Sequence, residues 1–236
     1  MEIRADLHIH TCLSPCADRE MSPPAVVRRG CERGLHVIAV CDHNSAENVE
    51  ATSRAAASTG LAVIGGIEIS TREEVHVLGL FGDDEGLRSA QEVVYENLAG
   101  ENDPETFGEQ LVMNERGEVV RHNGRLLIGA TGLSLEETVR TIHRLGGVAI
   151  AAHVDRPSFS LVSQLGFIPA GLGLDGVEVC CDVPPAVPED LAVVRSSDAH
   201  RPGEIGARYT RFLVERPTAS EIGMALRRME GRRIAT

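Results

Sequence analysis

The chain has 236 residues and a formal net charge of −12, and all 23 of its basic residues are arginines. The absence of lysine excludes Schiff-base chemistry, a pyridoxal phosphate anchor and a phosphate-binding loop that ends in GK[ST]. The acidic balance argues against nucleic acid or an anionic membrane as a partner. No run approaches the ~18 apolar residues that a membrane span needs, and residues 1–10 lack the apolar run of a signal peptide. We therefore expect a cytoplasmic protein with no membrane partner.

Short apolar strands alternate with segments of helical period from the N-terminus onward. In chain order, the pattern predicts strands at 3–10, 36–41, 61–70 and 75–81 and helices at 23–34, 46–59 and 85–98. Asn44 or Ser45 is the expected cap of the second helix. Residues 101–130 then break the rhythm, and a β-hairpin is predicted at 109–120 within them.

The alternation resumes after this insert. Ser134 and Glu137 have capping-box spacing, which predicts a helix at 134–145. Strands are predicted at 148–152, 177–181, 191–196 and 212–214, and a closing helix at 218–229. Strands that alternate with helices indicate an α/β fold with a mainly parallel sheet. About seven strands in a single domain over residues 1–236 favour a compact or distorted barrel.

The positions of the nine histidines are the main functional signal. Six of them stand at predicted strand ends, although one, His76, is near the start of its strand. Carboxylates occur at the same places. The set comprises His8, His10, His43, His76, His153 and His200 with Asp6, Asp18, Asp42, Glu68 and Asp198. Because the carboxyl ends of parallel strands meet at one rim, we expect these side chains to lie together.

Divalent cations would offset the cost of so many ionisable groups in one cleft. Imidazoles and carboxylates without thiolates suit Zn²⁺, Mn²⁺ or Fe²⁺, so Cys12 and Cys16 are expected to pack as reduced thiols. The donors exceed what one ion can use, which indicates two or three ions. Arg156 and Arg201 could bind a phosphate bidentately or form ordinary loop ion pairs. The other three histidines, at 36, 122 and 143, are expected to be structural or exposed.

Six motifs, in order along the chain, resemble those of the polymerase-and-histidinol-phosphatase (PHP) family. They are DLHIHT at 6–11, CDHN at 41–44, GIEI at 66–69, HVLGL at 76–80, AH at 152–153 and SDAH at 197–200. The resemblance implies a distorted (β/α)7 TIM-like barrel with two or three divalent metal ions, and phosphoester hydrolysis by a metal-bridging hydroxide near Asp198 and His200. The metal ligands that it implies are His8, His10, Asp18, His43, Glu68, His76, His153, Asp198 and His200. Asp18 takes the place where family members carry histidine or aspartate.

The predicted function is a metal-dependent phosphoesterase that acts on a small phosphorylated metabolite or nucleotide. Two alternatives remain open: a nuclease-like phosphodiesterase on single-stranded nucleic acid, and a non-catalytic metal-binding regulatory module. The insert at 101–130 matches none of the motifs, so it either covers the rim and shapes substrate choice or only packs. The sequence does not predict the oligomeric state.

Overall fold

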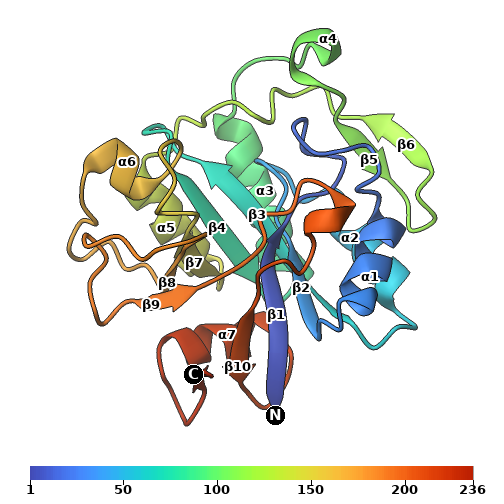
Figure 1. Cartoon of the computed structure of the whole chain (residues 1–236). Helices are drawn as coiled ribbons and strands as arrows, with labels where there is room; N and C mark the ends of the chain where they lie inside the picture. The colour runs from blue at the N-terminus through green and yellow to red at the C-terminus, as the bar shows by residue number, and fades with distance from the viewer. Residues whose placement is uncertain (236) are drawn as a thin grey trace.

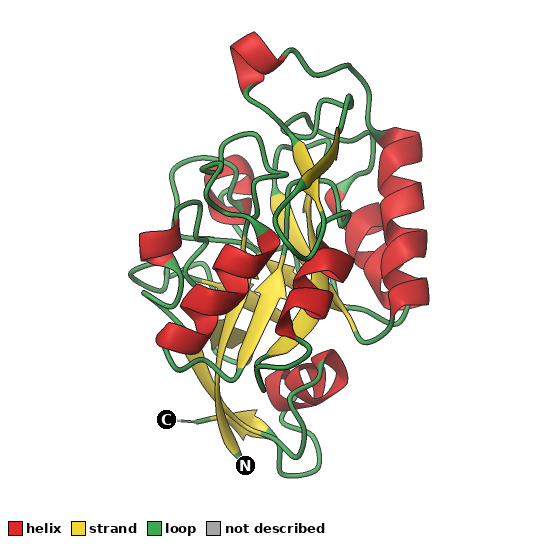
Figure 2. Ribbon diagram, turned by 90° about the vertical axis from the view of Figure 1, so that its right-hand side faces the viewer, coloured by secondary structure: helices red, strands yellow, loops and turns green. Residues whose placement is uncertain are grey.

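The computed structural model describes residues 1–235, which form a curled nine-stranded sheet flanked by helices (Figures 1 and 2). In sheet order the strands are β11 (Arg233–Ile234), β10 (Thr210–Leu213), β1 (Glu2–Ile9), β2 (Val37–Val40), β3 (Ala62–Ser70), β4 (His76–Phe81), β7 (Val148–Ala151), β8 (Gly176–Glu178) and β9 (Ala192–Val194). Each strand predicted for this sheet is confirmed, and so is the α/β class. The expected mainly parallel sheet is instead mixed, with four parallel and four antiparallel strand pairs, because β4 and β10 run against their neighbours. The observed strand ends differ from the predicted ones by up to three residues.

Helices cover the sheet and one of them enters its concave side. They are α1 (Pro23–Glu32), α2 (Val49–Ala56), α3 (Asp84–Asn97), α4 (Pro104–Phe107), α5 (Leu135–Arg144), α6 (Leu161–Leu165) and α7 (Ala219–Leu226), with a 3-10 helix η1 (Pro202–Glu204). The capping box of Ser134 and Glu137 at the start of α5 is confirmed. Short elements such as α4, α6 and η1 were not predicted. Within residues 1–235, no helix is both long enough and apolar enough to span a membrane.

The strand directions bring the predicted functional positions to one rim of the sheet, at the top of Figure 1. Strands β1, β2 and β3 are parallel, and so are β7, β8 and β9. Strand β4 runs antiparallel to both β3 and β7, so its first residue, His76, lies level with the last residues of its neighbours. This is why a histidine at the start of a strand belongs to the same rim as histidines at strand ends.

The sheet curls without forming a continuous barrel, because β9 and β11 are its edges. At the rim, the segment after β9 reaches β1: Ile9 and Ala199 form a parallel bridge, and the His10 amide donates to the Ala199 carbonyl at 3.0 Å. At the opposite end β10 pairs antiparallel with β1. The expected barrel is thus closed only where the functional residues gather.

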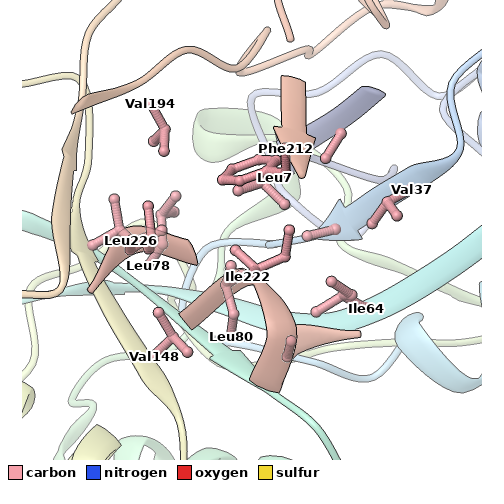
Figure 3. Close-up of a cluster of buried hydrophobic side chains, with 14 of the residues drawn as sticks. Leu7, Val37, Ile64, Leu78, Leu80, Val148, Val194, Phe212, Ile222 and Leu226 are labelled. Atoms are coloured by element: carbon pink, nitrogen blue, oxygen red, sulfur yellow. The ribbon is translucent and has the colours of Figure 1, made fainter. Parts of the chain in front are cut away.

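Apolar side chains fill the concave side of the sheet beneath the rim (Figure 3). Leu7 of β1, Leu78 of β4 and Phe212 of β10 are fully buried there. Helix α7 packs Ile222 and Leu226 among them, in the space between β10 and β9. Burial of this apolar surface is the main favourable contribution to the stability of the curled sheet. The rim lies directly above this core.

The insert folds over the rim, and its predicted hairpin is confirmed as β5 (Leu111–Met113) paired with β6 (Val119–His122). The Asn44 side-chain amide donates to the carbonyls of Leu127 at 2.9 Å and Gly129 at 2.8 Å, which ties the insert to the end of β2. Asn44 therefore does not cap α2, whose N-cap residue is Asn48. The prediction of a cap at Asn44 or Ser45 was wrong because Asn44 takes a positive φ and turns toward the insert.

Candidate metal centre

Six imidazoles and two carboxylates of the predicted site meet at the rim. Their positions are at the end of β1 (His8, His10), after β2 (His43), in β3 (Glu68), at the start of β4 (His76), after β7 (His153) and after β9 (Asp198, His200). All are buried except His200, which is half-buried. Residues separated by up to 192 positions thus share one small polar region.

The first group consists of His8, His10 and Asp198, with Glu68 beside it. The Nε2 atoms of His8 and His10 are 3.1 Å apart, and Asp198 Oδ1 is 3.4 Å and 3.0 Å from them, respectively. Each of these nitrogens is also 3.4 Å from an oxygen of Glu68. Ligand atoms that each lie ~2.0 to 2.2 Å from one ion are about 2.8 to 3.6 Å apart, from octahedral to tetrahedral geometry, so the spacing fits a cation between them.

The hydrogen bonds behind these imidazoles determine which nitrogen faces the group. His8 Nδ1 lies 2.9 Å from Glu178 Oε2, and a carboxylate only accepts. His10 Nδ1 lies 2.8 Å from Ser14 Oγ, whose own proton goes to Asp42 Oδ1 at 2.7 Å. Both Nδ1 atoms therefore carry a proton, and both Nε2 atoms face the group. Burial lowers the pKa of His8, but Asp198, Glu178 and Glu68 raise it well above its ordinary value, so in the metal-free site a proton on His8 Nε2 takes the place that a cation would fill. The spacing and type of these donors fit a bound metal ion.

Glu68 connects this group to a second one formed with His43 and His76. Glu68 Oε1 lies 2.9 Å from His76 Nδ1 and 3.2 Å from His153 Nε2, while Oε2 lies 2.7 Å from His43 Nδ1. The His43 nitrogen and Glu68 Oε2 are buried and make no hydrogen bond of acceptable geometry. Because Glu68 faces both groups, it has the geometry of a ligand shared by two ions.

Charges within the cluster shift its pKa values strongly. Burial raises the pKa of Glu68, but His76, His43 and His8 together hold it well below the ordinary value. Burial raises the pKa of Asp198 as well, and His8 and His10 more than reverse this. Burial lowers the pKa of His10, and the neighbouring His200 lowers it further. The carboxylates are thus ionised and His10 is neutral, which are the forms that bind metal. Burial lowers the pKa values of His8 and His43, but neighbouring carboxylates raise them well above the ordinary value, so these two imidazoles would release a proton when a metal binds.

A third group contains His10, His43 and His200, and it corrects the expectation for Cys16. Cys16 does not pack: it is exposed, lines the cleft and makes hydrogen-bonding contacts with His200 and His43. Burial of the thiol would raise the pKa of Cys16, but these two imidazoles lower it to about 6. Cys12 is buried against the hairpin, as expected.

Asp18 is the predicted ligand that the structure does not bring to the cluster. Its side chain is exposed and accepts from the amide of Glu20 at 2.9 Å, within its own turn. The place beside His43 and His200 is taken by Cys16. The physical reason is the series of turns after β1, which directs Asp18 away from the cleft although its backbone amide donates to the His200 carbonyl.

The cluster forms the floor of a cleft of about 220 Å³, whose lining includes Arg156, Ile128 and Phe159. Arg156 Nη1 lies 2.5 Å from Asp198 Oδ2, so this arginine reaches from the cluster to the open cleft. Arg201, the other expected phosphate ligand, is exposed at the start of η1 and is not among the residues that line the cleft. Its phosphate role stays a prediction.

Sequence reasoning missed Glu178, which is fully buried at the end of β8. Besides His8, its Oε2 accepts from the amide of His153 at 3.0 Å. A carboxylate within the apolar run VEVC at 177–180 was the available signal. Two of the three histidines set aside, His36 and His143, have partners elsewhere, and all three lie outside the cluster.

The fold and this donor set define a metal-dependent phosphoesterase, and comparison with known families gives the assignment. The profile of the PHP domain matches residues 6–157, and that of a PHP-associated segment matches residues 189–230. The chain therefore belongs to the PHP domain family, as the sequence motifs predicted. It is a hydrolase that acts on phosphoester bonds.

Several curated proteins and solved structures are similar to the chain. A 5'-3' exoribonuclease of Haemophilus influenzae is 28% identical over 194 residues, which are 65% of this chain and 69% of that protein. The lesion-specific endonuclease Q of Pyrococcus furiosus has a TM-score of 0.74 at 21% identity, over 99% of this chain and 58% of the endonuclease. A putative metal-dependent phosphoesterase of Bifidobacterium adolescentis has a TM-score of 0.55 at 20% identity, over 83% and 87%.

These comparisons overturn the expectation that nucleic acid is not a partner. The similar proteins include nucleases, and a second structure shows endonuclease Q in complex with a 27-mer duplex that carries an abasic lesion. The expectation came from the net charge of the whole chain. That sum does not describe the cleft, where a buried floor of donors for cations and the guanidinium of Arg156 lie together.

Proposed function

We propose that this chain hydrolyses phosphodiester bonds of nucleic acid at the rim cleft, with two or three divalent cations bound by the rim cluster. The observation that carries the proposal is the set of facing donors around Glu68, in which the Nε2 atoms of His8 and His10 lie 3.1 Å apart. Such a set of imidazole and carboxylate donors suits Zn²⁺, Mn²⁺ or Fe²⁺. The named activities of the similar nucleases support the choice of substrate.

Three overlapping sets of side chains would hold the ions. They are His8, His10, Asp198 and Glu68; Glu68, His43, His76 and His153; and His10, His43 and His200 with Cys16 beside them. When bound, such ions activate water near neutral pH and neutralise charge on the phosphate oxygens. Behind the first set, Glu178 and Ser14 hold the imidazoles of His8 and His10 in the required tautomers.

Arg156 supplies the chain's own positive charge to the substrate. Its guanidinium contacts Asp198 at 2.5 Å and lines the cleft, so it can keep this contact and donate to a phosphate oxygen with its remaining N–H groups. This contact also orients Asp198 toward His8 and His10. Arg156 would therefore position both the phosphate and a ligand of the first set.

A cleavage assay with purified protein tests the proposal. Protein loaded with Mn²⁺ or Zn²⁺ is incubated with labelled RNA and DNA oligonucleotides, single-stranded and duplex, in parallel with small phosphomonoesters. We expect oligonucleotide cleavage that is lost in His8→Ala and kept in His143→Ala, because His143 bonds to Asp175 outside the cluster. Hydrolysis of small esters without any cleavage of oligonucleotides would overturn the choice of substrate.

The second candidate is a small phosphorylated metabolite, the substrate class expected from the sequence. The cleft volume of about 220 Å³ favours it, because ligand pockets usually enclose ~300 to 1,000 Å³ and this one holds little more than a phosphate and a small group. The same volume suits one phosphodiester group of a chain whose remainder lies outside the cleft. The two candidates are separated by the substrate panel above.

A further inference from the structure

Two exposed apolar side chains face the mouth of the cleft above the polar floor. Phe159, in the loop between β7 and α6, is 46% exposed, and Ile128, in the insert, is 39% exposed. Aromatic residues make up only 3% of the chain. An exposed phenyl ring beside a phosphoesterase floor is therefore a feature that the hydrolytic chemistry itself does not explain.

The loop holds the Phe159 ring in a fixed place. Its backbone has a φ of +55°, a left-handed conformation that bulky residues rarely adopt. The Phe159 carbonyl accepts from the His76 amide at 3.1 Å. The next residue, Ser160, caps α6 and donates from its hydroxyl to the Arg156 carbonyl at 2.8 Å. Bonds on both sides thus keep an unfavourable conformation that presents the ring to the cleft.

One side of the ring already has a partner. The rings of Phe159 and His76 are stacked, with centroids 5.0 Å apart and planes at 18°. His76 is independently held by Glu68 at 2.9 Å, so it does not need the phenyl ring for its orientation. If Phe159 only shielded His76, burial of its whole ring would stabilise the fold more. Almost half of Phe159 is instead exposed to solvent. The open part offers a flat aromatic surface next to the expected metal ligands.

We propose that Phe159 is a stacking platform for the nucleobase adjacent to the scissile phosphate, with Ile128 as the facing apolar wall of the cleft. This inference rests on the proposed action on nucleic acid and deepens it. Stacking of a base on an aromatic ring is tolerant of sequence, because every base has a π-face. The platform would orient the nucleotide while Arg156 and the floor engage its phosphate.

Substitutions at Phe159, combined with removal of the base from the substrate, test this role. Phe159→Leu keeps apolar bulk and removes the aromatic surface, whereas Phe159→Trp keeps both. Phe167→Ala is the matched control, because Phe167 is 59% exposed and does not line the cleft. KM and kcat are measured on an oligonucleotide with a normal base beside the cleaved bond, and on one with an abasic residue there.

We expect Phe159→Leu to raise KM on the normal oligonucleotide about 5- to 150-fold and to leave KM on the abasic one nearly unchanged. Phe159→Trp and Phe167→Ala should resemble the wild type on both. Binding of an oligonucleotide with 2-aminopurine at the same position gives a readout without cleavage: its fluorescence should be quenched by the wild type and not by Phe159→Leu.

Each contrary result identifies what has failed. Equal losses on the two oligonucleotides would assign Phe159 a packing role and overturn the inference. Wild-type KM and quenching in Phe159→Leu would also overturn it, while leaving the nuclease function intact. If the wild type neither binds nor cleaves any oligonucleotide but hydrolyses small phosphoesters, the proposed action on nucleic acid is wrong. The stacking role of Phe159 is then wrong as well.

Discussion

Glu178→Gln tests whether the hydrogen bonds behind the metal ligands control metal binding. The Oε2 atom of Glu178 accepts from His8 Nδ1 at 2.9 Å and from the His153 amide at 3.0 Å, and the carboxylate is fully buried. Glutamine has nearly the same shape but no charge, and its carbonyl oxygen can take the place of Oε2, which already serves both donors. The imidazole of His8 therefore becomes a weaker ligand and loses its charged anchor.

The expected magnitude follows from the loss of the charge on the hydrogen-bond acceptor. Mutation of the hydrogen-bond partner behind a metal-bound histidine typically lowers metal affinity by about 10- to 100-fold. This range corresponds to about 1.4 to 2.7 kcal/mol, which agrees with the ~1.5 to 3 kcal/mol of a hydrogen bond to a charged group. Metal-free Glu178→Gln should therefore bind Zn²⁺ or Mn²⁺ 10- to 100-fold more weakly than the wild type.

The measurement is a titration of metal-free protein in competition with a chromophoric chelator, with thermal unfolding recorded in parallel. Glu221→Gln is the control, because Glu221 is also a buried glutamate but lies on α7, away from the rim, and bonds to Arg232. It should leave metal affinity unchanged. If a folded Glu178→Gln binds metal within twofold of the wild type, the assignment of Glu178 as an anchor of His8 is refuted.

Three further predictions concern the site and the core. His10→Ala should lose phosphodiesterase activity and lower the metal content measured by plasma mass spectrometry, because His10 borders two of the three donor groups; unchanged content would contradict this. In metal-free protein, the thiolate of Cys16 forms above its pKa of about 6, so alkylation by iodoacetamide should reach half of its maximal rate near pH 6 rather than near the ~8.5 of a free thiol. Leu226→Ala should lower the free energy of unfolding by about 2 to 5 kcal/mol in urea titrations, because it opens a cavity beneath the rim; a loss below 1 kcal/mol would show that α7 does not stabilise the curl.

Periodicity predicted the strands well because each has a strongly apolar register. The run at 36–41, for example, became β2 with every residue from Val37 to Val40 buried. The topology did not follow from the pattern, since β4 reads as apolar whether it runs parallel or antiparallel. The direction of β4 is set by the short connection from Ser70 to His76, which allows only a hairpin. That direction is what brings His76 to the rim.

The site was predictable where donors sit on strands and less so where they sit on turns. His8 and His10 alternate on β1, so one face of the strand fixes both. After the strand, Cys16 and Asp18 lie on successive turns, and sequence spacing does not say which side chain returns to the cleft. Glu178 was missed for another reason: a single carboxylate within the apolar run VEVC at 177–180 does not show that an imidazole is its partner.

The charge of the cleft explains why an acidic chain is compatible with a nucleic-acid substrate. Two divalent cations would bring four positive charges, against three negative charges from the carboxylates Glu68, Glu178 and Asp198. Exposed carboxylates elsewhere are screened within about 8 Å at physiological ionic strength, so they contribute little at the floor. With Arg156 added, a phosphate in the cleft meets positive charge although the chain as a whole carries −12. Binding of nucleic acid by this chain would therefore depend on the bound metal. The net charge of the whole chain would predict a negative cleft, whereas the metal-loaded cleft would be positive.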